Sequence, residues 1–383
     1  MSSFVNRRGF FANSLASLSA VRAALAQNES GIDLRRVAAK NNLLTGSAVS
    51  YRELHWPAFT ELLAEEAGIV VSENDMKWQT IHPAPDRYDF ARGDALVVFA
   101  RAQGQLVRGH NLCWHEQNPA WLHKMATPRN AAGLLGDHIA TVAGHYAGKI
   151  QAWDVVNEAI HVKDGLPGGF RNSLWYELLG PRYIDIAFHA ARKADAHALL
   201  TYNDYDLAQD SPEHESKRRA VLGLLRSLRE RKVPIDALGI QSHLRAGDKP
   251  YEWGGLHRFL AEIEALKLQV FVTELDVNDT ALPADTAARD RGVAALYADY
   301  LRNVLQHPSV KAVLTWGLTD RDTWLNHSNP RKDGLPERPL PFDADLRPTR
   351  AYFAMREQIA NAPARSLWHS PQAVETGMAH RRK

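Results

Sequence analysis

Short apolar runs alternate with longer amphipathic stretches along most of the chain, from about Leu43 onwards. The short runs have the length and the β-branched content of strands, and the longer stretches repeat their apolar positions with helical period. Eight strands are predicted, at Leu44–Val49, Ile69–Ser72, Leu106–Asn111, Ile150–Val156, Ala198–Tyr202, Ala237–Gln241, Gln269–Thr273 and Ala312–Trp316. The helical patterns include Trp56–Ala67, Leu134–Tyr146, Tyr183–Ala194, His214–Glu230, Leu256–Leu266, Ala287–Val304 and Ala351–Ile359.

This alternation predicts an α/β fold, a single (β/α)8 TIM barrel. Strands buried on both faces are apolar throughout, as Val270-Phe271-Val272 and Ala312-Val313-Leu314 are. Eight repeats over roughly 320 residues fit one barrel, with a site at the carboxyl ends of the strands. A doubly wound open sheet is the alternative. It usually carries a glycine-rich phosphate turn, and no G-x-G-x-x-G follows the first predicted strand.

The composition is that of an ordinary globular protein, with 45% hydrophobic and 23% charged residues among 383. The 46 Lys and Arg residues nearly balance the 44 Asp and Glu residues, and the basic run at the end, Arg381-Arg382-Lys383, is short. A nucleic-acid partner is not expected, because binding phosphates requires clustered cations. The single cysteine, Cys113, excludes an intrachain disulfide and is expected to be a small buried residue.

The first 26 residues resemble a twin-arginine signal peptide. Arg7-Arg8 precede a weakly apolar stretch, Phe10–Val21, and the small residues around Ala26 predict cleavage before Gln27. The stretch is too short and too rich in Ser and Ala to span a bilayer of about 30 Å. We therefore expect export by the twin-arginine route, to the periplasm or the medium, and no stable membrane association once the leader is removed.

The remaining chain is predicted to form one folded domain, residues 27–360, and a loosely held C-terminal tail, 361–383. The Pro-rich segment Asn326–Asp343 is predicted to be a long loop after the eighth strand. We expect a monomer.

Polar side chains gather where the predicted strands end. Because the carboxyl ends of the strands meet at one face of a barrel, these side chains are expected to line one pocket. They are Glu73, Asn74, Lys77 and Trp78 after the second strand, His110, Asn111, Trp114 and His115 at the third, Asn157 and Glu158 at the fourth, Asn203 and Asp204 at the fifth, Gln241 and His243 at the sixth, Glu274 and Asp276 at the seventh, and Trp316 and Asp320 at the eighth.

Two glutamates in this set suit the cleavage of a glycosidic bond. That reaction requires one acid to protonate the leaving oxygen and one carboxylate to attack the sugar or to activate water. Glu158 and Glu274 each follow a predicted strand and stand apart from other acidic residues on the pocket side. Taken singly, either glutamate is as well explained as an ion-paired structural carboxylate.

Seven sequence blocks, in order, resemble glycoside hydrolase family 10, the retaining endo-β-1,4-xylanases. They are Glu73–Trp78 (ENDMKW), Arg108–His115 (RGHNLCWH), Trp153–Glu158 (WDVVNE), Tyr202–Tyr205 (YNDY), Gly239–Leu244 (GIQSHL), Phe271–Asp276 (FVTELD) and Trp316–Trp324 (WGLTDRDTW). The resemblance implies hydrolysis of internal bonds of xylan or xylo-oligosaccharides with retention of configuration, a glycoside hydrolase domain over residues 27–360, and no cofactor or metal.

The resemblance also assigns roles to residues. It implies that Glu158 is the general acid/base, with a raised pKa, and that Glu274 is the ionised nucleophile. Asn157 is expected to bind the 2-hydroxyl of the sugar at the cleavage site. His243 is expected to orient Glu274, with Gln241 two residues before it on the same strand face.

Further residues are assigned to the non-reducing side of the cleaved bond. Polar groups there bind sugar hydroxyls, and aromatic rings pack against the apolar face of the sugar. The polar set is Glu73, Asn74, Lys77 and His110, and the aromatic set is Trp114, Trp316 and Trp324.

The chain departs from the family pattern at Ala147 and in the loop from Asn326 to Pro341, which bears on subsite details rather than on the two glutamates. Three other readings remain open. A metal-dependent barrel hydrolase could use His110, His115 and His243, although no H-x-H or H-E-x-x-H spacing occurs. A retaining glycosidase acting on mannan or β-1,4-glucan is closer. The third is a glycan-binding protein without turnover.

Overall fold

Eight parallel strands close into a barrel in the computed structural model, which describes residues 33–247 and 251–366. The order around the barrel is β1-β2-β3-β4-β5-β6-β8-β9, and β9 pairs with β1 to close it. The strands are β1 (Leu44–Val49), β2 (Ile69–Ser72), β3 (Leu106–His110), β4 (Ala152–Asn157), β5 (Leu199–Asp204), β6 (Ala237–Ile240), β8 (Gln269–Asn278) and β9 (Val310–Thr315). The predicted (β/α)8 TIM barrel is therefore confirmed.

The structure differs from the prediction where polar side chains were expected to follow the strands. Asn157, Asn203 and Glu274 lie within β4, β5 and β8 rather than after them. The seventh predicted strand was placed to end at Thr273, but β8 runs to Asn278 because a short additional strand, β7 (His243–Arg245), pairs with its end. Polar residues can extend these strands because the barrel supplies their backbone with hydrogen-bonding partners.

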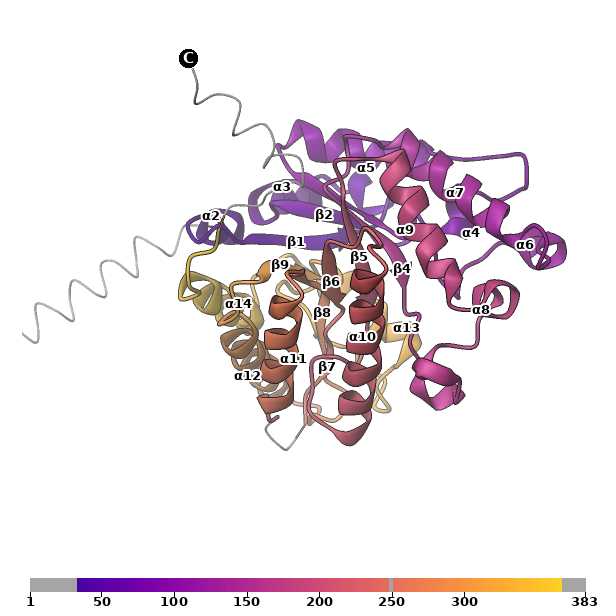
Figure 1. Cartoon of the computed structure of the whole chain (residues 1–383). Helices are drawn as coiled ribbons and strands as arrows, with labels where there is room; N and C mark the ends of the chain where they lie inside the picture. The colour runs from indigo at the N-terminus through magenta and orange to yellow at the C-terminus, as the bar shows by residue number, and fades with distance from the viewer. Residues whose placement is uncertain (1–32, 248–250, 367–383) are drawn as a thin grey trace, which may run out of the picture.

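Helices surround the barrel, one after each strand, and Figure 1 shows them arranged outside the strands. All seven helical patterns are confirmed to within about three residues at each end. The surrounding helices are α3 (Pro57–Glu66), α5 (Ala91–Ala102), α7 (Ala131–His145), α9 (Arg182–Ala194), α10 (Pro212–Glu230), α11 (Gly254–Ala265), α12 (Thr286–Val304) and α14 (Arg350–Ala360). Shorter helices are α2 (Leu34–Ala39), α4 (Trp78–Ile81), α6 (Ala120–Met125), α8 (Leu174–Leu179) and α13 (Leu325–Ser328).

The core has two layers because successive side chains of a strand point to opposite faces. Val71, Phe271 and Leu314 belong to the cluster that fills the barrel, and their neighbours Val70 and Val272 pack in the cluster between strands and helices. Close packing also explains one glycine of β3. A Cβ at Gly109 would lie 2.2 Å from the ring of Trp153, which is fully buried.

The expectation of a loosely held tail after Asn361 is wrong for residues 361–366. Arg365 is buried, and its guanidinium donates to the carbonyl oxygens of Val310 and Leu305 at 2.6 and 2.8 Å. Its backbone N–H also donates to the carbonyl of Asn41. These hydrogen bonds hold residues 361–366 against the segments that precede β1 and β9.

The long loop predicted after the eighth strand starts with α13 and is held by buried ion pairs. Arg331 and Arg289 both bind the carboxylate of Asp279, at 3.2 and 2.7 Å. Cys113 is buried, as expected. Within the described ranges no helix is long and apolar enough to cross a membrane. The predicted leader lies outside these ranges.

Candidate active site

The carboxyl ends of the strands surround a cavity of about 520 Å³. Each of the twelve residues that the sequence assigned to the site lines this cavity. They are Glu73, Asn74, Lys77, His110, Trp114, Asn157, Glu158, Gln241, His243, Glu274, Trp316 and Trp324. The barrel thus brings into one place side chains that are separated by up to 251 positions in the sequence.

Glu274 is a buried carboxylate held by two side-chain donors. Asn203 Nδ2 donates to its Oε1 at 2.7 Å, and His243 Nε2 lies 3.2 Å from its Oε2. Burial by itself would raise the pKa of Glu274. The hydrogen bond from His243, the charges of His110 and His243 and the bond from Asn203 together outweigh burial and lower the pKa to about 2. The carboxylate is therefore ionised and oriented before any ligand arrives.

His243 lies between two carboxylates. Its Nδ1 is 3.0 Å from Asp276 Oδ1, and β7 pairs with β8 so that His243 stands opposite Asp276. Burial would lower the pKa of His243, but Asp276 and Glu274 raise it to about 10. The ring is then an imidazolium that donates to Glu274 and forms an ion pair with Asp276. Trp324 Nε1 donates to the other oxygen of Asp276 at 2.7 Å, which fixes the position of that indole.

Glu158 follows β4 with a left-handed backbone, at a φ of 57°. Its backbone N–H donates to the carbonyl of Asn203 at 2.9 Å, and Arg171 Nε donates to its carbonyl oxygen at 2.8 Å. These two bonds hold a conformation that L-residues rarely adopt. Burial raises the pKa of the Glu158 carboxyl, with the bond from Gln241 opposing. The two glutamates are thus shifted in opposite directions.

The two oxygens of Glu158 have different surroundings. Oε1 accepts from Gln241 Nε2 at 2.9 Å and from Asn157 Nδ2 at 3.1 Å. Oε2 faces His115 Nδ1 at 3.8 Å and Arg171 Nη2 at 4.0 Å. Burial lowers the pKa of His115 to about 3, so that ring is neutral. Since Oε1 already receives two N–H donors, the proton of the neutral acid belongs on Oε2.

Asn203 connects the two glutamates; the sequence places it among the pocket residues but gives it no role. Its Nδ2 donates to Asn157 Oδ1 at 2.8 Å as well as to Glu274, and its Oδ1 accepts from Thr273 at 2.8 Å. Asn157 in turn binds Glu158, so a chain of side-chain hydrogen bonds runs from one carboxylate to the other. The YNDY block contained this residue, but only the barrel shows that its amide points at Glu274.

Polar and aromatic side chains line the part of the cavity formed by residues after β2, β3 and β9. Lys77 Nζ donates to Asn74 Oδ1 at 2.8 Å and lies 4.9 Å from the ring centre of Trp114. His110 Nδ1 is 2.9 Å from Asp154 Oδ2, and the ring of Trp316 meets His110 edge to face at 5.3 Å. These contacts keep each side chain in one orientation.

Four more residues line the cavity beside Glu158, namely Glu116, Gln117, Tyr205 and Asp206. Tyr205 is fixed because its hydroxyl bonds Arg171 Nη2 at 2.6 Å and its ring lies 3.5 Å below Lys217 Nζ. The sequence offered a signal for them, because Tyr205 ends the YNDY block and the other three directly follow the motifs at the third and fifth strands.

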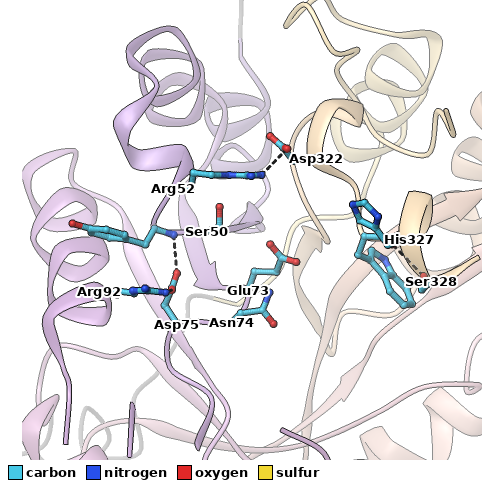
Figure 2. A pocket seen from close by; sticks show the side chains of 11 residues that line it. Ser50, Arg52, Glu73, Asn74, Asp75, Arg92, Asp322, His327 and Ser328 are labelled. Atoms are coloured by element: carbon cyan, nitrogen blue, oxygen red, sulfur yellow. Dashed lines mark hydrogen bonds and ion pairs between the residues drawn. The ribbon is translucent and has the colours of Figure 1, made fainter. Parts of the chain in front are cut away.

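A second cavity, of about 770 Å³, adjoins the first (Figure 2). Glu73, Asn74 and Trp324 line both cavities. The second adds Ser50, Tyr51 and Arg52 after β1, Asp75 and Arg92, and Asp322, His327 and Ser328 from the segment after β9. No site residue had been predicted at the end of the first strand.

A metal-dependent reaction gains no support from the side chains present. Among residues 33–247 and 251–366, no group of three or more His, Cys, Asp and Glu side chains is placed to hold a metal ion. His110, His115 and His243 each face a carboxylate rather than one another.

A TIM barrel with two oppositely shifted glutamates at its carboxyl face has the arrangement of a glycoside hydrolase. Residues 33–358 match the sequence profile of glycosyl hydrolase family 10. The chain is 34% identical over 330 residues to endo-1,4-beta-xylanase B of Thermotoga neapolitana, covering 85% of this chain and 91% of that one. It is also 34% identical to the beta-1,4-xylanase of Dictyoglomus thermophilum, covering 82% and 88%.

Solved structures agree with the sequence relatives. Native xylanase 10B from Thermotoga maritima superposes with a TM-score of 0.78 at 34% identity, covering 86% of this chain and 98% of that one. Xylanase 10B from Thermotoga petrophila, solved in complex with xylobiose, gives the same TM-score at 33% identity and the same coverage. The chain belongs to glycosyl hydrolase family 10.

Proposed function

We propose that this protein is an endo-1,4-β-xylanase, which hydrolyses internal bonds of xylan or xylo-oligosaccharides with retention of the anomeric configuration. The observation that supports the proposal most directly is the opposite shift of the pKa values of two glutamates joined by one hydrogen-bond network. The pKa of the buried Glu274 is lowered, and the pKa of the partly buried Glu158 is raised. Membership of a family whose relatives above are named as xylanases supports the choice of substrate.

In the first step Glu274 attacks the anomeric carbon while Glu158 gives its proton to the glycosidic oxygen. The bond from that carbon to the glycosidic oxygen breaks, the shortened chain leaves as an alcohol, and a covalent glycosyl–enzyme ester forms. Oε2 of Glu158 is the donor because Oε1 is occupied by Gln241 and Asn157. The leaving sugar therefore lies on the side of the cavity lined by Tyr205.

In the second step water releases the sugar from Glu274. Ester formation removes the negative charge of Glu274, which had favoured the protonated form of Glu158. The pKa of Glu158 then falls, so Glu158 can take a proton from the attacking water. Two inversions at the same carbon retain its configuration. Asn157 binds the 2-hydroxyl of the sugar in this proposal, a contact that strengthens as the ring flattens.

The non-reducing side of the cleaved bond is assigned to the half of the cavity opposite Tyr205. Lys77, Asn74, Glu73 and His110 are proposed to bind sugar hydroxyls there. The indole rings that stand nearby would cover the apolar sugar face. These are Trp114, Trp316 and Trp324.

The decisive experiment is digestion of xylan and of xylohexaose, with the products separated and the first-formed anomer read by NMR. We expect internal cleavage and a β-anomer that appears before mutarotation. Mannan and carboxymethylcellulose, assayed in parallel, test the rival substrates, and preferred cleavage of either would overturn the choice of xylan. The variant Glu274→Ala should lose turnover but keep binding of xylohexaose. An inactive parent that binds xylan would identify a binding protein instead.

Export by the twin-arginine route, a mature start at Gln27 and a monomeric state are also proposed. The sequence features of residues 1–26 support the first two. Replacing Arg7-Arg8 by Lys-Lys should keep the protein in the cytoplasm, and the N-terminal sequence of the exported form should begin at Gln27. A dimer in light scattering would contradict the monomer.

A further inference from the structure

Arg171 connects the backbone of Glu158 with the leaving-group side of the cavity. Its side chain is only 12% exposed, and it stands behind Tyr205, which lines the cavity. The guanidinium uses two of its N–H groups for short hydrogen bonds. Nε donates to the carbonyl oxygen of Glu158 at 2.8 Å, and Nη2 donates to the hydroxyl of Tyr205 at 2.6 Å. One side chain therefore holds both the acid/base and a wall of the cavity.

A short antiparallel pairing brings Arg171 back to Glu158. The chain leaves Glu158 through Ile160, which forms a bridge with Phe170. The backbone N–H of Arg171 donates to the carbonyl of Ala159 at 2.8 Å, which closes the loop between them. Residue 171 thus returns beside the acid/base 13 positions later in the chain. Because its backbone is fixed there, the side chain reaches the Glu158 carbonyl from one defined direction.

Tyr205 gives the other end of the guanidinium a fixed partner. Its backbone N–H donates to Oδ1 of the buried Asp204 at 2.9 Å. Its ring lies 3.5 Å from Lys217 Nζ, and this ammonium is itself bound to Asp204 at 2.7 Å. The tyrosine is therefore held by its backbone, by its ring and by its hydroxyl. A hydroxyl placed in this way can fix the orientation of Arg171.

Glu158 needs such support because its backbone is left-handed, with a φ of 57°. A side chain other than glycine adopts this conformation only where its surroundings hold it. The N–H of Glu158 is held by the carbonyl of Asn203, and its carbonyl is held by Arg171. Arg171 Nη2 remains 4.0 Å from Oε2 of Glu158, which is too far for a hydrogen bond. The arginine thus fixes the backbone of the acid without occupying the oxygen that gives the proton.

We propose that Arg171 is a positioning residue for the acid/base, which holds Glu158 in its left-handed conformation and, through Tyr205, keeps Oε2 facing the glycosidic oxygen of the leaving sugar. The proposal rests on the function proposed above. General acid catalysis requires the acid to lie within hydrogen-bonding reach of the leaving oxygen, and it contributes roughly 10²- to 10⁴-fold to the rate. A displaced Glu158 should therefore slow cleavage only where the leaving group needs a proton.

The test compares two substrates that differ only in the leaving group. Phenyl β-xylobioside has a basic leaving group that needs a proton, whereas 2,4-dinitrophenyl β-xylobioside releases a stable anion without one. The quantity measured is kcat/KM, because it reports the steps up to formation of the glycosyl–enzyme. The readout is the ratio of kcat/KM on the phenyl glycoside to that on the dinitrophenyl glycoside. A change that merely loosens the cleft should lower both values equally and leave this ratio unchanged.

The variants Arg171→Met and Arg171→Lys should each lower kcat/KM on the phenyl glycoside by about 10-fold or more, and on the dinitrophenyl glycoside by less than about threefold. Lysine keeps the charge but lacks the planar fork that binds two acceptors at once. Tyr205→Phe removes only the bond to Nη2 and should lower the ratio by a smaller factor. The matched control is Arg192→Met. Arg192 Nη1 donates to the carbonyls of Ala196 and Ala198 before β5, at the opposite end of the barrel, so its loss should keep the parental ratio.

The outcomes separate this proposal from the proposed function. An equal loss on both glycosides in the Arg171 variants would overturn the positioning role while leaving the xylanase function intact. A parental ratio in Arg171→Lys would show that a positive charge alone suffices, and would overturn it as well. If neither Arg171 variant folds, Tyr205→Phe decides, and a parental ratio in that variant overturns the proposal. A parent protein that cleaves neither glycoside nor xylohexaose would refute the xylanase function itself.

Discussion

The variant His243→Gln tests the electrostatic reasoning about the nucleophile most directly. His243 is the donor 3.2 Å from Glu274 Oε2 and is held as a cation by Asp276. The lowering of the pKa of Glu274 from its ordinary 4.5 to about 2 corresponds to about 3 kcal/mol in favour of the carboxylate. Glutamine keeps an N–H donor but removes the positive charge, while burial, which raises the pKa, remains.

The sign of the pH effect follows from the role of Glu274. The nucleophile works only when ionised, so activity falls as the pH drops through its pKa. In the parent that loss should lie below about pH 4. In His243→Gln the pKa of Glu274 rises, and the acidic limb should move up by one pH unit or more. At neutral pH, kcat/KM should fall about 10- to 100-fold, because a hydrogen bond between charged groups is lost.

The assay is kcat/KM for 4-nitrophenyl β-xylobioside between about pH 2 and pH 10. Its activated leaving group reduces the need for protonation by Glu158 and so isolates the acidic limb. Thermal unfolding at each pH separates inactivation from denaturation, and His189→Gln, an exposed change on α9, serves as the control. An acidic limb of His243→Gln that coincides with that of the parent would refute the account of Glu274.

Three further predictions concern other parts of the molecule. With an activated aryl xylobioside, Glu158→Ala should slow hydrolysis of the glycosyl–enzyme more than its formation. The covalent adduct should then accumulate in mass spectra, and azide should restore turnover. The absence of both the adduct and the azide rescue would count against the acid/base role of Glu158. Gly109→Ala should lower the free energy of unfolding by about 1–3 kcal/mol in denaturant titrations, since the added Cβ would lie 2.2 Å from the ring of Trp153. An unchanged free energy of unfolding would show that the ring can move away. Arg365→Met should lower the free energy of unfolding by about 1–3 kcal/mol, because the carbonyls of Val310 and Leu305 lose their donor. The control Arg347→Met, at an exposed ion pair, should lower it by less than about 0.5 kcal/mol. Equal effects would argue against the anchoring of residues 361–366.

The barrel fold and the residues that line the cleft could be predicted from the sequence because both depend on local sequence patterns. Side-chain alternation and length distinguish buried strands from helices without knowledge of their neighbours, and the parallel order of the strands places their carboxyl ends at one face. The motif residues could therefore be assigned to a single pocket before any contact was known. Trp153–Glu158 and Phe271–Asp276 were the most informative blocks.

Other features depended on contacts between segments distant in the chain. The sequence has no signal for the extension of β8 to Asn278, since that requires β7 beside it. The second cavity also remained hidden, because it forms only where the loop after β1 meets the segment after β9, as in the pair of Arg52 with Asp322. Likewise, the spacing of hydrophobic residues along the chain, which distinguishes helices from strands, does not show how residues 361–366 attach to the barrel.

The sequence by itself determined which side chains are available for acid–base chemistry and at which end of the barrel they gather. Only the tertiary structure shows which contacts lower the pKa of Glu274 and raise that of Glu158. The physical reason is that a pKa depends on burial and on the charges and donors within a few ångströms. Here those neighbours come from three other strands: Asn203 from β5, Gln241 from the end of β6 and His243 from β7.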